Sequence, residues 1–284
     1  MKVAVTGAGG FIGRHVVAAL ERIDGPPPVL VFRPGSAPPG AGADRVVEMD
    51  LARPPRDAFE RLGEPDVLVH LAWDGLPNYT SARHLEEELP AQRAFLGQLL
   101  EAGLAGLTVT GTCFEYGMQP GALGEDAPAA PVTAYGRAKD ELRRWLEDEH
   151  ARRPFRLTWA RLFYLHGEGQ APGSLLPQLD AAITRGDPVF NLSGGEQLRD
   201  YLPVEEAAGY LVGLARNGLD NGTVNVCSGR PISVRELVEG EVRRRGSMIE
   251  LNFGHYPYPE HEPMAFWGDR TRLDRILEAS RAVV

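Results

Sequence analysis

The sequence predicts an α/β protein with a doubly wound parallel sheet and a smaller C-terminal lobe. Short apolar, β-branched runs alternate with helical patterns over the first 165 residues. Each run is continuously apolar, which is typical of parallel strands buried on both faces. A glycine-rich turn joins the first run to a helical pattern. Together these observations indicate the Rossmann arrangement.

The predicted elements follow one another in order. KVAVTG leads into a helix from about residue 12 to 23, and the apolar runs VLVF, RVVEMDL and DVLVHLA follow. A helix over residues 81–102 leads into LTVTGT, and one over residues 134–152 leads into RLTWARLF. We assign residues 1–165 to a dinucleotide-binding domain, to which later segments can return.

After residue 165 the pattern changes to short elements and to loops rich in Gly and Pro, such as FGHYPYPEHEP. We predict a mainly substrate-binding lobe over residues 166–284. The loop carries four side chains that raise the question of a metal site: His255, Glu260, His261 and Glu262. Their irregular spacing, broken by prolines, favours a surface lid, so we expect no metal.

Composition and charge exclude several classes of function. A chain of 284 residues that is 43% apolar can bury a sizeable core. No run approaches the roughly 18 apolar residues of a membrane span, and a net charge of −9 argues against a nucleic-acid partner. MKVAVTG leaves no room for a signal peptide, and two cysteines suit a reducing compartment. We therefore expect a cytoplasmic protein.

The turn TGAGGFIGRH carries Gly7, Gly10 and Gly13 at the end of the first strand. Glycine there allows a tight turn and lets a pyrophosphate approach the N-terminus of the helix. A tight turn without a ligand is the alternative, but its place after an N-terminal buried strand favours nucleotide binding. We expect Phe11 and Ile12, within the turn, to line the cofactor site.

The end of the second strand indicates which dinucleotide is bound. VLVFRPGS presents Arg33 where an acid would bind the ribose 2′-hydroxyl of NAD. Arginine suits the 2′-phosphate of NADP instead, and Arg14 is placed to assist. For both, a solvated surface arginine is the alternative. We predict NADP(H) in preference to NAD(H).

TAYGRAKDEL places Tyr135 and Lys139 four residues apart, on one side of a predicted helix. Tyrosine with its ordinary pKa of about 10 is a poor acid at neutral pH. A nearby ammonium and a positive nicotinamide ring would lower that pKa. The motif is short, but GxxGxxG and GTCFEYG at earlier positions make the combination specific.

These motifs resemble the extended branch of the short-chain dehydrogenase/reductase superfamily, the NAD-dependent epimerase/dehydratase family. RLFYLHGEGQ, GEQLRDYLPVEE and NVCSGRPISVREL are similar to its later segments, so the resemblance covers almost the whole chain. It implies that Asp50 and Leu51 lie against adenine and that Leu71 and Ala72 line the cofactor. It also implies that Arg199 contacts the diphosphate of a nucleotide sugar.

Four further residues are candidates for the substrate pocket. Tyr164 stands where the family has asparagine, which leaves substrate placement around it open. Trp73 and Asp74 follow the cofactor turn, and loop packing is an equal alternative for Trp73. Glu115 replaces the apolar residue usual before the Tyr-Gly pair. It contacts the sugar or pairs with a local arginine, and both interpretations stay open.

By the resemblance, GTCFEYG selects the reaction. Thr112 takes the place of the serine or threonine that donates to the substrate carbonyl beside Tyr135. Cys113 and Phe114 stand where 4,6-dehydratases carry an Asp-Glu pair, which disfavours a dehydratase. Cys113 is also one residue away from the cysteine of the 3,5-epimerase-reductases of GDP-fucose synthesis, so we interpret it as a packing residue.

Hydride transfer at C4 remains. The resemblance implies an NADPH-dependent reductase of a nucleotide-linked 4-keto-6-deoxy sugar, with a dTDP-fucose-type product for cell-surface polysaccharides. Tyr135 would protonate the alkoxide, Thr112 would orient the carbonyl, and Lys139 would hold the ribose. The alternatives are a nucleotide-sugar 4-epimerase with bound NAD, a catalytically silent NADP-binding sensor, and a reductase of a non-nucleotide carbonyl. By analogy, the helices around 84–102 and 135–151 form a homodimer interface.

Overall fold

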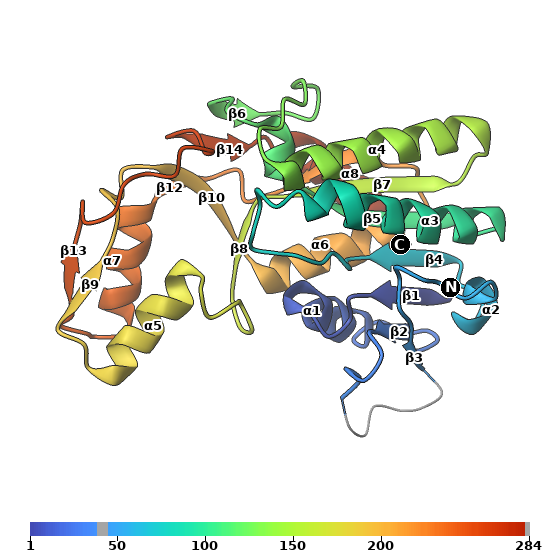
Figure 1. The fold of residues 1–284 in the computed structure, drawn as a ribbon, viewed down its shortest axis with the longest axis horizontal. Helices are drawn as coiled ribbons and strands as arrows, with labels where there is room; N and C mark the ends of the chain where they lie inside the picture. The colour runs from blue at the N-terminus through green and yellow to red at the C-terminus, as the bar shows by residue number, and fades with distance from the viewer. Residues whose placement is uncertain (39–44, 282–284) are drawn as a thin grey trace.

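A seven-stranded sheet forms the centre of the molecule in the computed structural model, which describes residues 1–38 and 45–281 (Figure 1). Its order is β11-β7-β5-β4-β1-β2-β3, and every neighbouring pair is parallel. In that order the strands are Gly222–Val226, Arg156–Leu162, Gly106–Thr112, Val67–His70, Val3–Thr6, Val29–Phe32 and Val46–Glu48. The predicted doubly wound parallel sheet is therefore confirmed.

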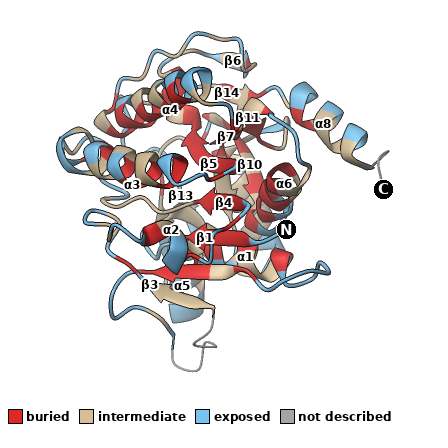
Figure 2. Cartoon of the chain, turned by 90° about the vertical axis from the view of Figure 1, so that its right-hand side faces the viewer, coloured by how far each residue is buried: buried red, intermediate tan, exposed pale blue. Residues whose placement is uncertain are grey.

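Helices cover both faces of this sheet. One face carries α1 (Phe11–Leu20), α6 (Val204–Arg216) and α8 (Thr271–Arg281), and the other carries α2 (Ala58–Arg61), α3 (Leu89–Glu101) and α4 (Ala134–Arg152). Along β1, Val3 and Val5 belong to one core while Ala4 belongs to the other. This two-sided burial explains the continuously apolar strands. Figure 2 shows the buried strands between helices whose outer faces are exposed.

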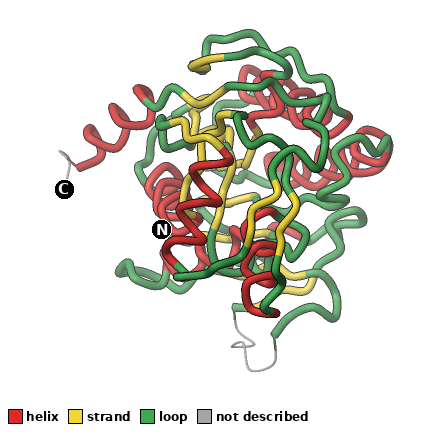
Figure 3. The backbone as a smooth tube through the Cα atoms, turned by 90° about the vertical axis from the view of Figure 1, so that its left-hand side faces the viewer, coloured by secondary structure: helices red, strands yellow, loops and turns green. Residues whose placement is uncertain are grey.

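The second half of the chain supplies elements to both parts of the fold. α6 packs against α1, and β11 pairs with β7 at the edge of the large sheet. The smaller lobe contains one sheet of β8 (Tyr164–His166), β10 (Leu198–Pro203) and β12 (Pro231–Ser233), and the pairs β9 (Val189–Asn191) with β13 (Glu250–Asn252) and β6 (Gly121–Leu123) with β14 (Phe266–Gly268). Its helices are α5 (Leu175–Arg185) and α7 (Val234–Arg244). Figure 3 views the molecule from this side and shows short strands joined by long loops.

The smaller lobe begins at the carboxyl end of the large sheet, because only Phe163 separates β7 from β8. In open α/β sheets, ligands bind outside the carboxyl ends of the strands. The fold therefore indicates that a ligand binds between the carboxyl ends of the strands and the smaller lobe. Among the described residues, no helix is both long and apolar enough to cross a membrane.

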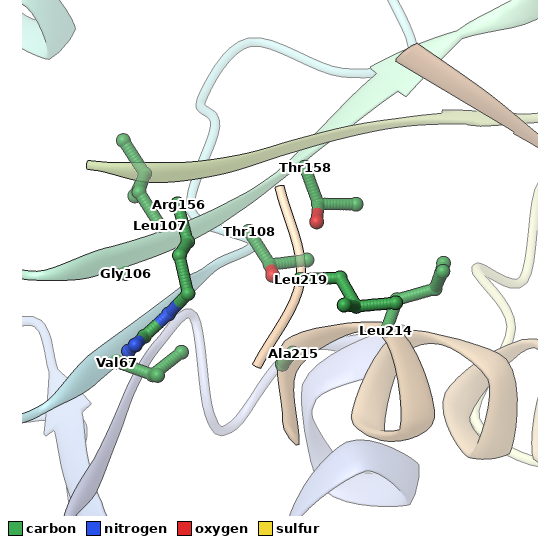
Figure 4. Close-up of a pocket in the computed structure, with 9 residues that line it drawn as sticks. All are labelled: Val67, Gly106, Leu107, Thr108, Arg156, Thr158, Leu214, Ala215 and Leu219. Atoms are coloured by element: carbon green, nitrogen blue, oxygen red, sulfur yellow. The ribbon is translucent and has the colours of Figure 1, made fainter. Parts of the chain in front are cut away.

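A small cavity lies at the opposite end of the sheet. Val67, Gly106 and Arg156, where β4, β5 and β7 begin, line it together with Leu214 and Ala215 of α6 (Figure 4). Its volume is about 10 Å³, which is room for about one water molecule. It is therefore too small for a substrate or cofactor and is not a candidate site.

Candidate active site

The glycine-rich turn connects β1 to α1 at the carboxyl edge of the sheet. Gly7 has a φ of +69°, a conformation that glycine adopts readily and other residues rarely do. A Cβ on Gly13 would lie 2.0 Å from the carbonyl oxygen of Gly7, so α1 approaches the strand end only because residue 13 has no side chain. Among the described residues no side chain caps α1, and its first turn carries no acid. The free N–H groups and the positive end of the helix dipole therefore suit a phosphate.

Tyr135 stands in the first turn of α4, against the end of β5. The hydroxyl of Thr133 caps this helix by accepting the N–H of Gly136 at 3.0 Å. A Cβ on Gly136 would lie 2.7 Å from the carbonyl oxygen of Phe114. The glycine thus lets α4 pack directly on the 3₁₀ turn η2 (Cys113–Tyr116), which brings Tyr135 next to Thr112.

Burial dominates the ionisation of Tyr135 and Lys139. Burial raises the pKa of Tyr135; Tyr79 and Glu115 add to the rise, and a hydrogen bond with Thr112 opposes it. Burial lowers the pKa of Lys139 to about 7, although Glu115 raises it. The Lys139 ammonium lies 5.9 Å from the centre of the Tyr135 ring. In the protein alone, burial therefore keeps the pKa of Tyr135 above its ordinary value. The predicted lowering includes the charge of a bound nicotinamide ring and stays a prediction.

The Lys139 ammonium is held by two neighbours inside the site. It donates to the carbonyl oxygen of Thr110 at 2.9 Å and lies 4.0 Å from the centre of the Trp73 ring. Trp73 in turn donates from Nε1 to Nδ1 of His84 at 3.1 Å. His84 begins the π-helical turn η1 (His84–Glu88), and its ring centre lies 5.3 Å from that of Tyr135. Trp73 therefore packs directly beside the predicted catalytic pair.

Thr112 ends β5 and caps η2. Its hydroxyl oxygen accepts the N–H of Phe114 at 3.3 Å, and its own N–H donates to Glu115 at 2.8 Å. Glu115 is fully buried and also accepts from Arg161 Nε at 2.7 Å and Trp159 Nε1 at 3.0 Å. These partners hold Glu115 inside the core. The expectation that it contacts the sugar is therefore replaced by the alternative, pairing with an arginine.

The turn after β4 is held by a buried histidine that the sequence analysis did not single out. The Thr6 hydroxyl donates to Nδ1 of His70 at 2.8 Å, and Nε2 donates to Gln92 Oε1 at 2.6 Å. The Thr6 oxygen also accepts the N–H groups of Leu71 and Ala72, at 3.3 and 3.4 Å. Burial, aided by the charge of Lys139, lowers the pKa of His70 to about 3. The neutral ring therefore positions the turn predicted to line the cofactor, and a histidine ending a buried strand was its only signal in the sequence.

Arg33 and Asp74 lie together, although they were predicted for the cofactor and the substrate respectively. They follow β2 and β4, and the guanidinium donates to Asp74 at 3.0 Å. Both side chains are well exposed, at 69% and 40%. Exposed ion pairs contribute at most about 1 kcal/mol, so a phosphate can compete for Arg33. Asp50 is exposed beyond β3 and accepts the N–H of Ala52 at 3.0 Å.

Tyr164 and Arg199 line a cavity of about 400 Å³ between the short strands of the smaller lobe and the loop that follows β13. The guanidinium of Arg199 lies 2.8 Å from Glu262, and the Tyr164 hydroxyl donates to the same carboxylate at 2.7 Å. Glu262 is therefore paired with Arg199, the arginine for which the resemblance implies contact with a diphosphate. The remaining lining includes Phe190, Leu192, Gln197 and Val234. In the described residues no group of acids, histidines and cysteines has the arrangement of a metal site.

The surroundings of Tyr135 are aromatic. Ring centres of Tyr79 and Phe114 lie 5.7 and 6.4 Å from its own, and Tyr164 packs against Phe114 at 6.4 Å. Cys113 is buried in a cluster with Tyr116 and Phe163, and burial raises the pKa of its thiol. Neither residue after Thr112 is therefore suited to exchange protons with a sugar at neutral pH.

Comparison with known proteins identifies the family of the chain. A profile of the NAD dependent epimerase/dehydratase family matches residues 3–227. The chain belongs to this family. The dTDP-6-deoxy-L-talose 4-dehydrogenase (NAD(+)) of Aggregatibacter actinomycetemcomitans is 27% identical over 271 residues, 94% of this chain and 99% of the relative. The UDP-glucose 4-epimerase of Azospirillum brasilense is 26% identical over 297 residues, 95% of this chain and 85% of the relative.

Solved structures of the epimerase/dehydratase type have the same fold. MoeE5 in complex with UDP-glucose and NAD superposes with a TM-score of 0.83 at 27% identity, over 98% of this chain and 92% of that one. The names of this structure and of the talose dehydrogenase both specify NAD. These relatives therefore support a nicotinamide dinucleotide but give no support for NADP over NAD.

Proposed function

We propose that this member of the epimerase/dehydratase family is a 4-ketoreductase of a nucleotide-linked 4-keto-6-deoxy sugar. The observation that carries the proposal is the composition of the site: Tyr135 and Thr112 adjoin an aromatic wall that includes Phe114. Removal of water from a sugar needs an acid and a base at the two positions after Thr112. A buried thiol and a phenyl ring supply neither, whereas ketone reduction needs only a hydride and one proton.

The residues divide the reaction between them. When bound, the nicotinamide supplies the hydride to C4 of the sugar. The Tyr135 hydroxyl gives its proton to the ketone oxygen, so that the ketone gains one hydride and one proton and becomes an alcohol. The Thr112 hydroxyl, whose oxygen already accepts the Phe114 N–H, retains its proton to donate to that oxygen. Lys139 would bind the ribose hydroxyls.

The predicted binding residues fit two adjoining regions. For the cofactor we propose the turn and the strand ends, namely Gly7, Gly10, Phe11, Ile12, Gly13, Asp50, Leu51, Leu71 and Ala72. For the nucleotide sugar we propose the cavity of about 400 Å³, where Arg199 would exchange Glu262 for the diphosphate, with Trp73 and Asp74 on the side of the sugar. Residues 166–284 would thus form most of the substrate lobe.

The direct test measures oxidation of NADPH and NADH in the presence of dTDP-4-keto-6-deoxyglucose, with product identification by NMR. Oxidation of the cofactor, with a product that keeps its configuration at C3 and at C5, supports the proposal. A nucleotide-sugar 4-epimerase is the second candidate, and the UDP-glucose 4-epimerase relative favours it. Interconversion of UDP-glucose and UDP-galactose without net cofactor oxidation would establish the epimerase and defeat the reductase.

Replacement of Arg33 by alanine tests the proposed preference for NADP. Because a hydrogen bond to a charged group contributes about 1.5–3 kcal/mol, Arg33→Ala should weaken NADPH binding about tenfold or more and leave NADH binding nearly unchanged. Fluorescence titration of both cofactors against both proteins measures this. Asp74→Ala is the matched control, since it removes the acceptor of the same surface pair and frees the guanidinium. Equal losses for NADPH and NADH in Arg33→Ala would contradict the preference.

We also propose a cytoplasmic homodimer formed through α3 and α4, which pack on each other, with Gly97 against Trp145. Sedimentation velocity of the purified chain tests the dimer. A single species with the mass of one chain across the concentration range would exclude it.

A further inference from the structure

Glu115 connects three elements that carry or support the predicted catalytic residues. From η2, its carboxylate accepts from the Thr112 N–H at 2.8 Å and from Trp159 and Arg161 of β7, at 3.0 and 2.7 Å. Arg143 of α4 lies 3.9 Å away. α4 also carries Tyr135 and Lys139. The Glu115 side chain, which has no exposed surface, therefore links η2 to β5, β7 and α4 around the site.

The chain makes room for this carboxylate. A Cβ on Gly111 would lie 2.5 Å from Glu115 Oε1 and 2.2 Å from Trp159 Nε1. Gly111 lies within β5 and is not among the residues with positive φ, so its backbone does not require glycine. The missing side chain instead provides the space in which Glu115 reaches Thr112 and β7. GTCFEYG is thus one packed unit.

Stability alone does not account for the buried pair. Replacing a buried ion pair by apolar side chains is often neutral or stabilising, because both charges lose their hydration. Here the arrangement is not fully satisfied, since among the described residues Arg161 Nη1 has no hydrogen-bond partner. Because burying this charge pair costs free energy of folding, we interpret its role as holding the neighbouring groups in position.

We infer that Glu115 is a positioning residue that holds Thr112 in the orientation needed to bind the substrate carbonyl, an inference that rests on the proposed ketone reduction. Glu115 and Thr112 form a reciprocal capping box: the Thr112 oxygen accepts the N–H of Phe114, and the Glu115 carboxylate accepts the N–H of Thr112. The box fixes the Thr112 oxygen on the Phe114 N–H and so directs the hydroxyl proton away from η2. Without the carboxylate, the Thr112 N–H loses its acceptor and the turn loses one of its two closing bonds.

The test replaces both charges, so that no unpaired charge remains in the core. The double variant Glu115→Leu with Arg161→Met should fold with a melting temperature close to that of the wild type. We expect its kcat to fall about 30-fold or more while the KM for the sugar and the Kd for the dinucleotide change less than about threefold. Glu115→Gln, which retains an acceptor, should recover most of the kcat if it folds. Glu149→Gln is the matched control, because Glu149 is also a buried, arginine-paired carboxylate but lies at the far end of α4.

A second measurement does not depend on turnover. In the peptide that spans residues 106–117, the amide hydrogen of Thr112 should exchange about tenfold faster or more in the double variant than in the wild type. Its exchange rate should be unchanged in Glu149→Gln. A stable double variant with wild-type kcat and wild-type exchange would overturn the inference. If the wild type reduces no nucleotide sugar, the proposed function fails; accelerated exchange then still supports the positioning of Thr112 by Glu115, and unchanged exchange refutes it.

Discussion

Replacement of Tyr135 by phenylalanine is expected to lower kcat about a thousandfold while leaving the dissociation constant of the dinucleotide within about threefold of the wild-type value. The variant loses only the hydroxyl that gives its proton to the ketone oxygen. The ring keeps its contacts with Tyr79 and Phe114, so the site keeps its shape. Steady-state reduction of the 4-keto sugar, with fluorescence titration of the cofactor, measures both quantities.

Tyr210→Phe is the matched control for this variant, since Tyr210 lies on α6, away from the site, and also loses one hydroxyl. Its kcat should equal that of the wild type. A Tyr135→Phe protein that retains more than about a tenth of the wild-type kcat would contradict the role of this hydroxyl. Wild-type protein that binds the dinucleotide but turns over no substrate would favour the catalytically silent sensor.

The sheet was predictable from the sequence because its signal is local. Strands such as VAVT of β1 are buried on both faces, so the run is apolar up to Thr6, whose hydroxyl is hydrogen-bonded to His70. The glycine turn was equally readable, since Gly7 and Gly13 meet each other within a single strand-to-helix connection. Where the role of a residue depends on neighbours only a few positions away in the chain, a single sequence is sufficient to predict that role.

The pairing and the pKa values of the site residues depend on neighbours that are distant in the sequence, so they were less predictable. Glu115 meets Arg161, 46 residues later, and Arg199 meets Glu262, 63 residues later. No spacing rule relates such positions, because they meet only after β7 and the loop after β13 are in place. The Tyr135 pKa illustrates the same limit: the sequence contains the neighbouring lysine but not the depth at which both groups are buried.

Lys139 provides the second large expected effect, on stability as well as activity. Burial lowers its pKa in the folded chain to about 7 from 10.5, with Glu115 opposing the shift. Between about pH 7 and pH 10.5 the unfolded chain binds a proton that the folded chain lacks, so the free energy of unfolding rises with pH across this range. Below about pH 7 both states are protonated, and the folded state bears the whole cost of a buried ammonium.

Lys139→Met should therefore be more stable than the wild type in the absence of cofactor, by up to a few kcal/mol below pH 7. The gain is reduced by about 1 kcal/mol for the lost hydrogen bond to the Thr110 carbonyl, and it should shrink steadily towards pH 10. Turnover should fall about a hundredfold at the same time, because the ribose loses its ammonium partner. Urea unfolding of both proteins between about pH 6 and pH 10 measures the difference.

The chain offers one matched control for Lys139→Met, because Lys2 is its only other lysine. Lys2 is exposed, so Lys2→Met should leave the pH dependence of unfolding unchanged. Stability curves for Lys139→Met and wild type that run parallel from about pH 6 to pH 10 would show that the ammonium is not desolvated in the folded chain. Converging curves would place the ammonium in a site that lowers the stability of the fold and serves the reaction, which is the pattern expected when a charged group is retained for catalysis.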